Sequence, residues 1–154
     1  MKSYILPFAA LFVSTVSFAF PQCAKPSQTV FHCTTTKGKI IEVCDSGKTI
    51  DYAFGKPDVA PEIIVKAPRQ SASTYQWQGI GRTISYAVDV PNGKTTYSVY
   101  WAFEKPMEEN DEPEPEGGVA VLANGKTLAT VTCDPKKEIV QRIEGIDLRP
   151  TPED

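Results

Sequence analysis

The stretch RTISYAVDVPNGKTTYSVYWAF, residues 82–103, decides the fold. Apolar residues alternate with small and polar residues on both sides of Asn92-Gly93, and Asn-Gly is a typical centre of a two-residue hairpin turn. We therefore predict an antiparallel hairpin whose buried face has period two. Its predicted facing pairs are Val90 with Thr95, Val88 with Tyr97, Tyr86 with Val99, and Ile84 with Trp101. The opposite, outward face carries Tyr100.

Similar turn signals recur along the chain as a tripeptide in which Gly-Lys follows a variable residue. Four of these tripeptides have their glycine at Gly38, Gly47, Gly93 and Gly125. Each lies between apolar or β-branched runs, which predicts strands over residues 29–35, 39–44, 49–54, 62–66, 119–123 and 127–133. The sequence thus indicates a mainly β fold, a small antiparallel barrel or sandwich of about seven strands.

The segment after the last predicted strand has helical features. Asp134 can cap a helix, Pro135 suits its first turn and Gly145 can end it. Between them lies an apolar stripe at helical spacing, formed by Ile139, Val140 and Ile143. We therefore expect a short C-terminal helix on the sheet, followed by a flexible tail over residues 149–154.

Residues 1–19 resemble a cleavable export signal. Lys2 precedes an apolar run over residues 4–13, and Ser17 and Ala19 are the small residues expected before a cleavage point. The run is shorter than the roughly 20 apolar residues of a membrane span, and Gln22 does not fit a lipoprotein signal before Cys23. We expect a single β domain over residues 20–148, in the periplasm or secreted, with no stable membrane insertion.

All four cysteines follow the predicted signal: Cys23, Cys33, Cys44 and Cys133. An even count outside the cytoplasm favours disulfides, whereas a zinc site needs closer pairs. Cys33 shares a strand face with Phe31, which we predict to be in the core. Cys44 lies on the strand face opposite Ile41 and Val43, so it is predicted to point outward. This facing favours Cys33–Cys133 with Cys23–Cys44. A shifted turn at Gly38 would permit Cys33–Cys44 with Cys23–Cys133, so both pairings stay open.

The segment over residues 104–117 is acidic and rich in proline, and we expect an exposed loop without a core. One interpretation is a solvated linker. The other is a contact for a basic protein partner through Glu108, Glu109, Asp111 and Glu112. Its proline spacing does not match a calcium loop. The net charge of −3 argues against a nucleic-acid partner.

Residues 73–82 form the most distinctive stretch of the chain. Tyr75, Trp77 and Arg82 are residue types that anchor interfaces, and aromatic rings with amides also suit sugars. The simpler interpretation is a glycine-bearing bend that leads into the next strand, with Trp77 in the core.

The inventory of titratable residues is sparse for an enzyme. His32 is the only histidine and is predicted to be a surface residue, and the acids are concentrated in the loop. The sequence places no catalytic partner beside His32. We therefore expect no enzyme activity, no metal site and no cofactor.

Residues 33–44, 50–55 and 124–133 resemble a group of exported proteins of Gram-negative bacteria that have no known activity. The size, export signal and cysteines are also loosely similar to those of periplasmic lysozyme inhibitors. Their Ser-Gly-x-x-Tyr motif is not reproduced by residues 81–86, so no inhibitory residue carries over. We expect a non-enzymatic binding protein, such as an inhibitor or immunity protein against a cell-wall-directed enzyme. The alternative is a cell-envelope or surface interaction module.

Overall fold

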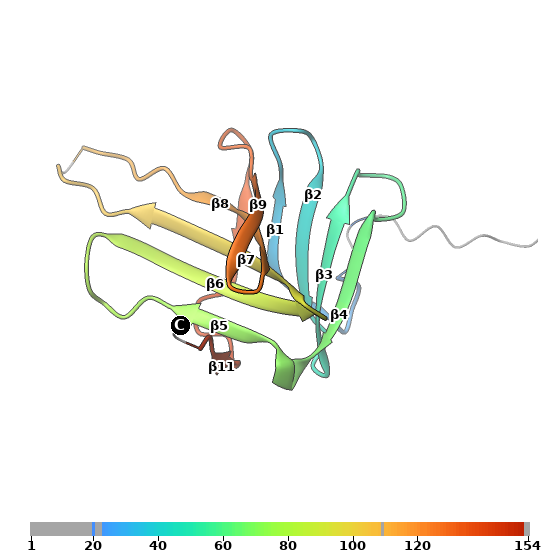
Figure 1. Ribbon diagram of the computed structural model, residues 1–154. Coiled ribbons are helices and arrows are strands. Elements are labelled where there is room, and N and C mark those ends of the chain that lie inside the picture. Colours follow the sequence, from blue (N-terminus) through green and yellow to red (C-terminus); the bar gives the residue numbers. More distant parts are fainter. Residues whose placement is uncertain (1–19, 21–22, 109, 153–154) are drawn as a thin grey trace, which may run out of the picture.

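Two sheets pack face to face, and their strands run across one another (Figure 1). The computed structural model describes residues 20, 23–108 and 110–152. The predicted signal over residues 1–19, Glu109 and residues 153–154 therefore lie outside the described residues. The sheets are not closed into a barrel, so of the two predicted architectures the sandwich is the better description.

The first sheet has the order β10-β1-β2-β3-β4. Its strands are β1 (Gln28–Thr34), β2 (Ile40–Asp45), β3 (Thr49–Gly55), β4 (Ile63–Pro68) and β10 (Ile139–Gln141). All of its neighbours pair antiparallel. A single 3₁₀ turn, η1 (Arg69–Ser71), then leads into the second sheet.

The second sheet has the order β11-β5-β6-β7-β8-β9. Its strands are β5 (Ser73–Gln76), β6 (Thr83–Asn92), β7 (Thr95–Glu104), β8 (Glu116–Ala123), β9 (Lys126–Thr132) and β11 (Arg149–Pro150). β11 is parallel to its neighbour, β5, whereas the other strand pairs described in this sheet are antiparallel. The mainly β prediction is confirmed, and β5, β10 and β11 were not foreseen.

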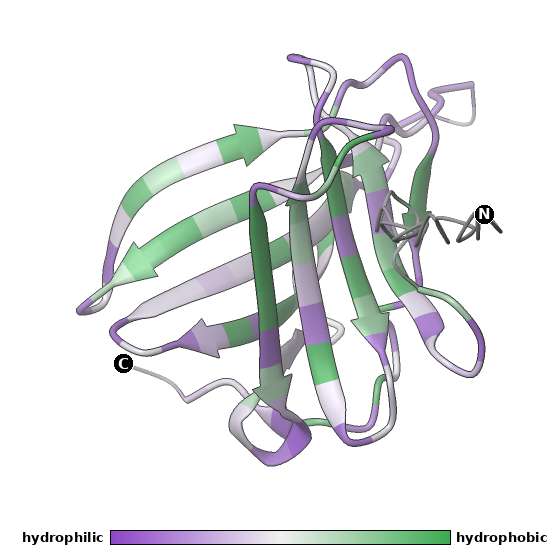
Figure 2. Ribbon diagram, turned by 90° about the vertical axis from the view of Figure 1, so that its right-hand side faces the viewer, coloured by the Kyte–Doolittle hydropathy of each residue, from purple (hydrophilic) through white to green (hydrophobic). Residues whose placement is uncertain are grey.

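Alternation along the strands builds the core between the sheets (Figure 2). From the first sheet, Phe31, Ile41 and Val43 are fully buried, and from the second Val88 and Val99 are fully buried. Tyr52 of β3 and Tyr97 of β7 stack across the interface, with ring centroids 4.6 Å apart. Stacked aromatic pairs add to the stabilisation from buried area, so this contact helps to hold the two sheets together.

The central hairpin, β6–β7, forms as predicted but with a different register. Asn92 pairs with Thr95, so Gly93-Lys94 occupies the turn, and Val90 faces Tyr97. Gly93 has φ 62° at the first central position, where a type II′ turn takes glycine. The predicted pairing is therefore wrong by two residues along β7, because the turn uses Gly-Lys in place of Asn-Gly.

A shift of two residues preserves the faces of the hairpin. Tyr86 is buried, and Ile84, Tyr97 and Trp101 are half-buried against the core rather than fully buried. Trp101 lies 6.1 Å from the Tyr86 ring and 5.1 Å from Phe103, measured between centroids. The turn between β8 and β9 does follow the Asn-Gly expectation, because φ is positive at both of its central residues.

The Cys33–Cys133 disulfide joins the two sheets at one corner. Beside it, Thr35 forms a β-bridge with Cys133, and the Asp134 amide donates to the Thr34 carbonyl at 2.8 Å. A Cβ on Gly117 would lie 3.1 Å from the Phe31 ring and 3.3 Å from the Cys133 sulfur. Glycine at this position of β8 therefore makes room for both the ring and the disulfide.

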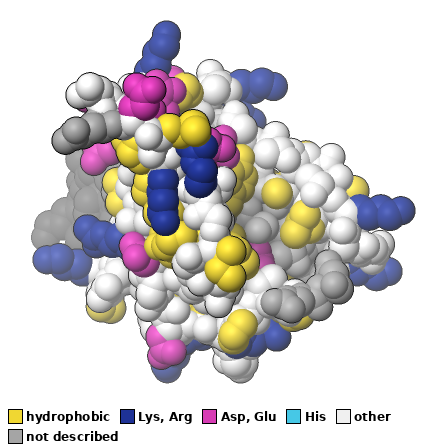
Figure 3. Space-filling model, turned by 90° about the vertical axis from the view of Figure 1, so that its left-hand side faces the viewer, with side chains coloured by type: hydrophobic (Ala, Val, Ile, Leu, Met, Phe, Trp, Pro, Cys, Tyr) yellow, Lys and Arg dark blue, Asp and Glu magenta, His cyan; other side chains and the backbone are white. Residues whose placement is uncertain are grey.

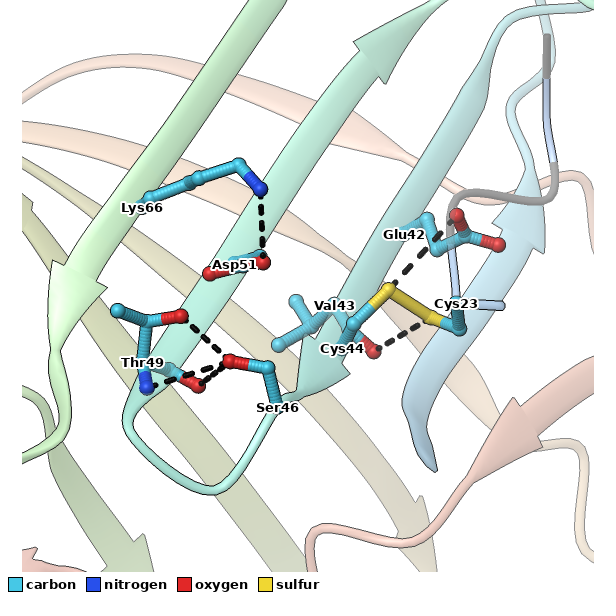
Figure 4. The surroundings of a disulfide bond; sticks show 8 residues. All are labelled: Cys23, Glu42, Val43, Cys44, Ser46, Thr49, Asp51 and Lys66. Atoms are coloured by element: carbon cyan, nitrogen blue, oxygen red, sulfur yellow. Dashed lines mark hydrogen bonds and ion pairs between the residues drawn. A yellow bond between two sulfur atoms is a disulfide. The ribbon is translucent and has the colours of Figure 1, made fainter. Parts of the chain in front are cut away.

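The second disulfide, Cys23–Cys44, lies on the outer face of the first sheet (Figure 4). The predicted pairing and the outward direction of Cys44 are both confirmed. The buried Glu42 carboxylate and the two sulfurs lie within 4.8 Å of one another, but the sulfurs are bonded to each other and offer no thiolate to a metal. Farther along this face, Asp51 forms a cross-strand ion pair with Lys66 at 3.5 Å.

The predicted C-terminal helix is wrong. The Asp134 side chain instead accepts from the Lys136 amide in a turn, and β10 pairs with the open edge of β1. The described residues contain no α-helix. The open edge of β1, next to the Cys33–Cys133 disulfide, offers backbone hydrogen-bond partners that a helix packed on the sheet would leave unused. Ile143 is buried in the core in this arrangement too.

The segment from Arg149 was expected to be loose, yet its first residues add to the second sheet as β11. The Thr151 amide donates to the Thr74 carbonyl at 2.9 Å. The Thr151 hydroxyl donates to the buried Asp89 carboxylate at 2.6 Å. The Arg149 guanidinium donates to the Ser71 carbonyl at 3.1 Å. Residues 149–151 are therefore held by hydrogen bonds that local composition does not reveal.

Removing either disulfide should destabilise the fold, and removing Cys33–Cys133 should cost more. It joins residues 100 apart in sequence, against 21 for Cys23–Cys44. Loop-closure entropy then gives contributions of about 4.7 and 3 kcal/mol. Urea unfolding of the C33A/C133A and C23A/C44A variants measures both. An equal loss, or a larger loss for C23A/C44A, would contradict the corner as the main constraint.

Stability should fall in alkaline solution because of buried tyrosines. Burial raises the pKa of Tyr52, and the neighbouring Tyr97 raises it further. Burial, then Glu144, raises the pKa of Tyr86. A tyrosine whose pKa is higher in the folded than in the unfolded state stabilises the protein at pH values below the unfolded pKa of about 10. This stabilisation is lost as the pH rises above that unfolded pKa towards the folded one. Urea unfolding between about pH 9 and 11 should show this decline. The decline should be shallower for Tyr52→Phe, and an identical slope in both proteins would refute this assignment.

Candidate functional site

Residues 73–82 divide into β5 and a bend that protrudes beyond it. The bend covers residues 77–82 and connects β5 to β6. Trp77 packs half-buried against the core, as the simpler interpretation expected. Its indole N–H donates to the Ile80 carbonyl at 3.0 Å, and the Lys105 ammonium lies 4.2 Å from the ring centroid. Trp77 thus fixes the bend to the body of the protein.

Ile80 is the most exposed large apolar residue in the described part of the chain, at 84% exposure. Glycines stand on both sides of it: Gly79 has φ 81° and Gly81 has φ 85°. Residues that carry a side chain rarely adopt this left-handed backbone conformation. The two glycines therefore allow the chain to turn twice within three residues. The bend therefore presents Ile80 at a tip whose backbone is anchored by Trp77.

The acidic loop lies next to this bend, between β7 and β8. The Asp111 carboxylate is bonded within the loop. It accepts hydrogen bonds from the backbone amides of Met107, at 3.3 Å, and Glu108, at 3.1 Å. Glu112 is exposed, and so is Met107, at 77%. A carboxylate that accepts backbone amides organises a turn, so part of the loop is ordered and presents both acids and an apolar side chain.

A groove of about 580 Å³ separates the acidic loop from the ends of β6 and β7. Arg82, Lys105, Met107, Asp111 and Glu112 are among its lining residues. The Arg82 guanidinium donates to the Lys105 carbonyl at 3.0 Å, and the backbones of the same two residues bond as well. Figure 3 shows this end of the molecule, where hydrophobic side chains surround lysine or arginine side chains and acidic side chains lie above them.

The structure brings most of the predicted contact residues to one end of the sandwich. Trp77 and Arg82 both contact Lys105, which lies at the start of the acidic loop. Tyr75, at 46% exposure, lines a separate groove beside β5, and Glu109 is outside the described residues. Ile80 and Met107 were not among the predicted site residues. The two glycines around Ile80 were a readable signal, whereas nothing in the sequence marks Met107.

His32 lies elsewhere, on β1 of the other sheet. It pairs with Val140 of β10 and with Glu42 of β2, and it is half-buried, where sequence alone predicted exposure. Among the described residues, no helix has the length and apolar character needed to cross a membrane. The two disulfides are consistent with an oxidising compartment.

Comparison of the chain with protein-family models, with curated protein sequences and with solved structures gave no significant match. The surface chemistry of the bend over residues 77–82 and of the acidic loop is therefore the basis on which a function can be inferred.

Substitution of Gly81 should test the anchored bend. Gly81→Val should lower stability by about 1–2 kcal/mol, because a side chain in the left-handed region meets the backbone. Gly81→Asn should lower it less, since asparagine tolerates this region. Glu138→Gln, at an exposed position outside the bend, serves as the control and should stay within about 0.5 kcal/mol. Thermal unfolding ranks the three variants, and equal effects of Val and Asn would show that the φ of Gly81 is not constrained.

Proposed function

We propose that the mature domain is a non-enzymatic binding protein of the periplasm or the extracellular space, and that it docks on a basic protein. The observation that supports this best is Ile80, held at an exposed tip beside an acidic loop. An exposed apolar residue on a fixed backbone loses little conformational entropy on binding. The surrounding acids attract a partner of opposite charge.

The two loops have different roles in this proposal. The exposed glutamates of the acidic loop steer a basic partner and increase the rate of encounter. Ile80 and Met107 supply apolar area that holds the complex once it has formed, which mainly lowers the rate of dissociation. An inhibitor or immunity protein for a cell-wall-directed enzyme, such as a basic lysozyme, fits both roles.

A cell-envelope interaction module is the second candidate. The exposed Tyr75 of β5 favours it, because an aromatic face with nearby amides can contact an uncharged surface. Sedimentation of the mature protein with purified peptidoglycan distinguishes the two candidates. Co-sedimentation in the absence of any protein partner supports the module, whereas inhibition of a lysozyme in solution supports the inhibitor.

The kinetics of binding to an inhibited lysozyme should separate the two loops. Neutralising the acidic loop (E108Q, E109Q, D111N, E112Q) should slow association and weaken its dependence on salt. The amide that D111N introduces keeps an acceptor oxygen for the turn that organises the loop. Ile80→Ser should instead speed dissociation, by roughly tenfold or more if the tip is a central contact. Biolayer interferometry at several salt concentrations measures both rates.

Matched controls make this experiment specific to the site. Glu138→Gln neutralises an exposed acid near β10, and Leu128→Ser removes an apolar side chain on β9 that is 65% exposed. Both controls should leave the kinetics unchanged. If the loop variants behave like these controls, the partner docks elsewhere and the acidic loop is only a linker.

A further inference from the structure

A second groove, of about 420 Å³, lies beside β5 and reaches the protruding bend at Gln78. Tyr75 and Gln78 form one part of its lining. The C-terminal segment supplies alternate apolar residues, which are Ile146, Leu148, Pro150 and Pro152. Ile146 and Leu148 also pack against the core, so this wall is continuous with the body of the protein.

The described residues that line this groove include no charged side chain. None of the nine is aspartate, glutamate, lysine or arginine, in a chain whose residues are 23% charged. Ligand sites are commonly concave and mainly apolar, with a few polar groups, and have volumes of about 300–1,000 Å³. The size and lining of this groove fit that description, and an ionised ligand would find no partner among these residues.

Apart from the Tyr75 hydroxyl, the polar side chains that line the groove donate hydrogen bonds inside the protein. The Gln76 amide donates to the Thr74 hydroxyl and to the Ile143 carbonyl, both at 2.9 Å, and its oxygen accepts from the Gly145 amide. The Thr74 hydroxyl donates to the Ala87 carbonyl at 2.7 Å. The Gln78 amide donates to the Gln76 carbonyl at 2.6 Å.

Few polar side-chain atoms in the described lining are then left for a ligand, and this selects among uncharged ligands. A sugar carries many hydroxyls, and each hydroxyl that enters the groove without a partner loses its hydrogen bonds to water at a cost of about 1–3 kcal/mol. An aliphatic or proline side chain needs no polar partner. The groove therefore favours an apolar segment of polypeptide over a neutral glycan.

We propose that this groove binds an extended, uncharged, proline- and aliphatic-rich segment of the protein partner. Proline-rich segments dock in aromatic-lined grooves, because their extended conformation is already formed before binding. Here Tyr75 supplies the ring and residues 146–152 supply the opposite wall. The inference rests on the proposed function, in that it assigns the segment to the same partner that contacts Ile80.

The groove and the bend are linked through Gln78, which lines the groove two residues before Ile80. The wall is also ordered in advance, since Arg149 and Thr151 bond to η1 and to β5. A preformed groove reduces the ordering cost of binding. One partner can thus place an apolar segment beside Tyr75 while its basic groups face the acidic loop.

The test uses the ¹⁵N-labelled mature protein and defined probes. The first probe is a nonapeptide of Pro-Pro-Leu repeats with blocked ends, the second is a blocked Gly-Ser peptide of equal length, and the third is chitohexaose. Titration of the first probe should shift the amide resonances of Tyr75, Gln78, Ile146 and Leu148 in a saturable way. The other two probes should leave these resonances unchanged.

Variants at exposed positions of the groove should weaken the binding. Tyr75→Ser removes the ring and Gln78→Glu introduces a charge, so each should raise the dissociation constant for the Pro-Pro-Leu peptide at least fivefold. Leu128→Ser is the matched control and should have no effect. No saturable shift, equal shifts with the Gly-Ser peptide, or binding of chitohexaose in preference to the peptide would each overturn the proposal.

Failure of the groove can be distinguished from failure of the proposed function. If Tyr75→Ser leaves partner binding unchanged and the peptide does not bind, while Ile80→Ser still speeds dissociation, the groove proposal fails alone. If the peptide binds beside Tyr75 but partner binding is insensitive to Ile80→Ser and to the acidic loop, the groove stands and the docking site at the bend is wrong.

Discussion

The covalent link between Cys33 and Cys133 is the constraint on which the arrangement of the two sheets depends. It lies at a corner where β1 of one sheet and the residue after β9 of the other approach as closely as neighbouring strands. Phe31 fills the space beside it, and Gly117 leaves that space open. Because the corner fixes β1 against the second sheet, the edge of β1 is placed where β10 can pair with it. The stacked Tyr52 and Tyr97 rings then hold the facing surfaces together farther from the corner.

Much of this sandwich is readable from the sequence, because period-two alternation and glycine turns are local signals. The faces of β6 and β7 follow from alternation alone, and the outward direction of Cys44 favours Cys23 as its partner without excluding Cys33. The register of the β6–β7 hairpin could not be derived from these local signals, since Asn92-Gly93 and Gly93-Lys94 are both acceptable turn centres. Only the pairing of two whole strands distinguishes between them.

The C-terminal segment shows where local information is insufficient. Asp134, Pro135 and the stripe over residues 139–143 satisfy helix rules, and the same residues satisfy a turn followed by a short edge strand. The choice depends on the free edge of β1, which is more than a hundred residues away in the sequence. Ile80 differs in kind, since its neighbouring glycines were visible but their conformation was not. Residues 149–151 likewise owe their order to Asp89, Thr74 and Ser71, which no local pattern connects to them.

The pairing of β1 with β10 also affects how the chain folds as it is made. β1 is the first strand to be synthesised. The disulfide partner of its Cys33, which is Cys133, and the strand β10 that covers its edge both lie near the other end of the chain. The β1 edge therefore stays uncovered until residue 141 has emerged, and contacts of this separation form slowly. An uncovered strand edge can pair with other chains. Until the C-terminal strands are in place, the edge of β1 is therefore open to pairing with other chains.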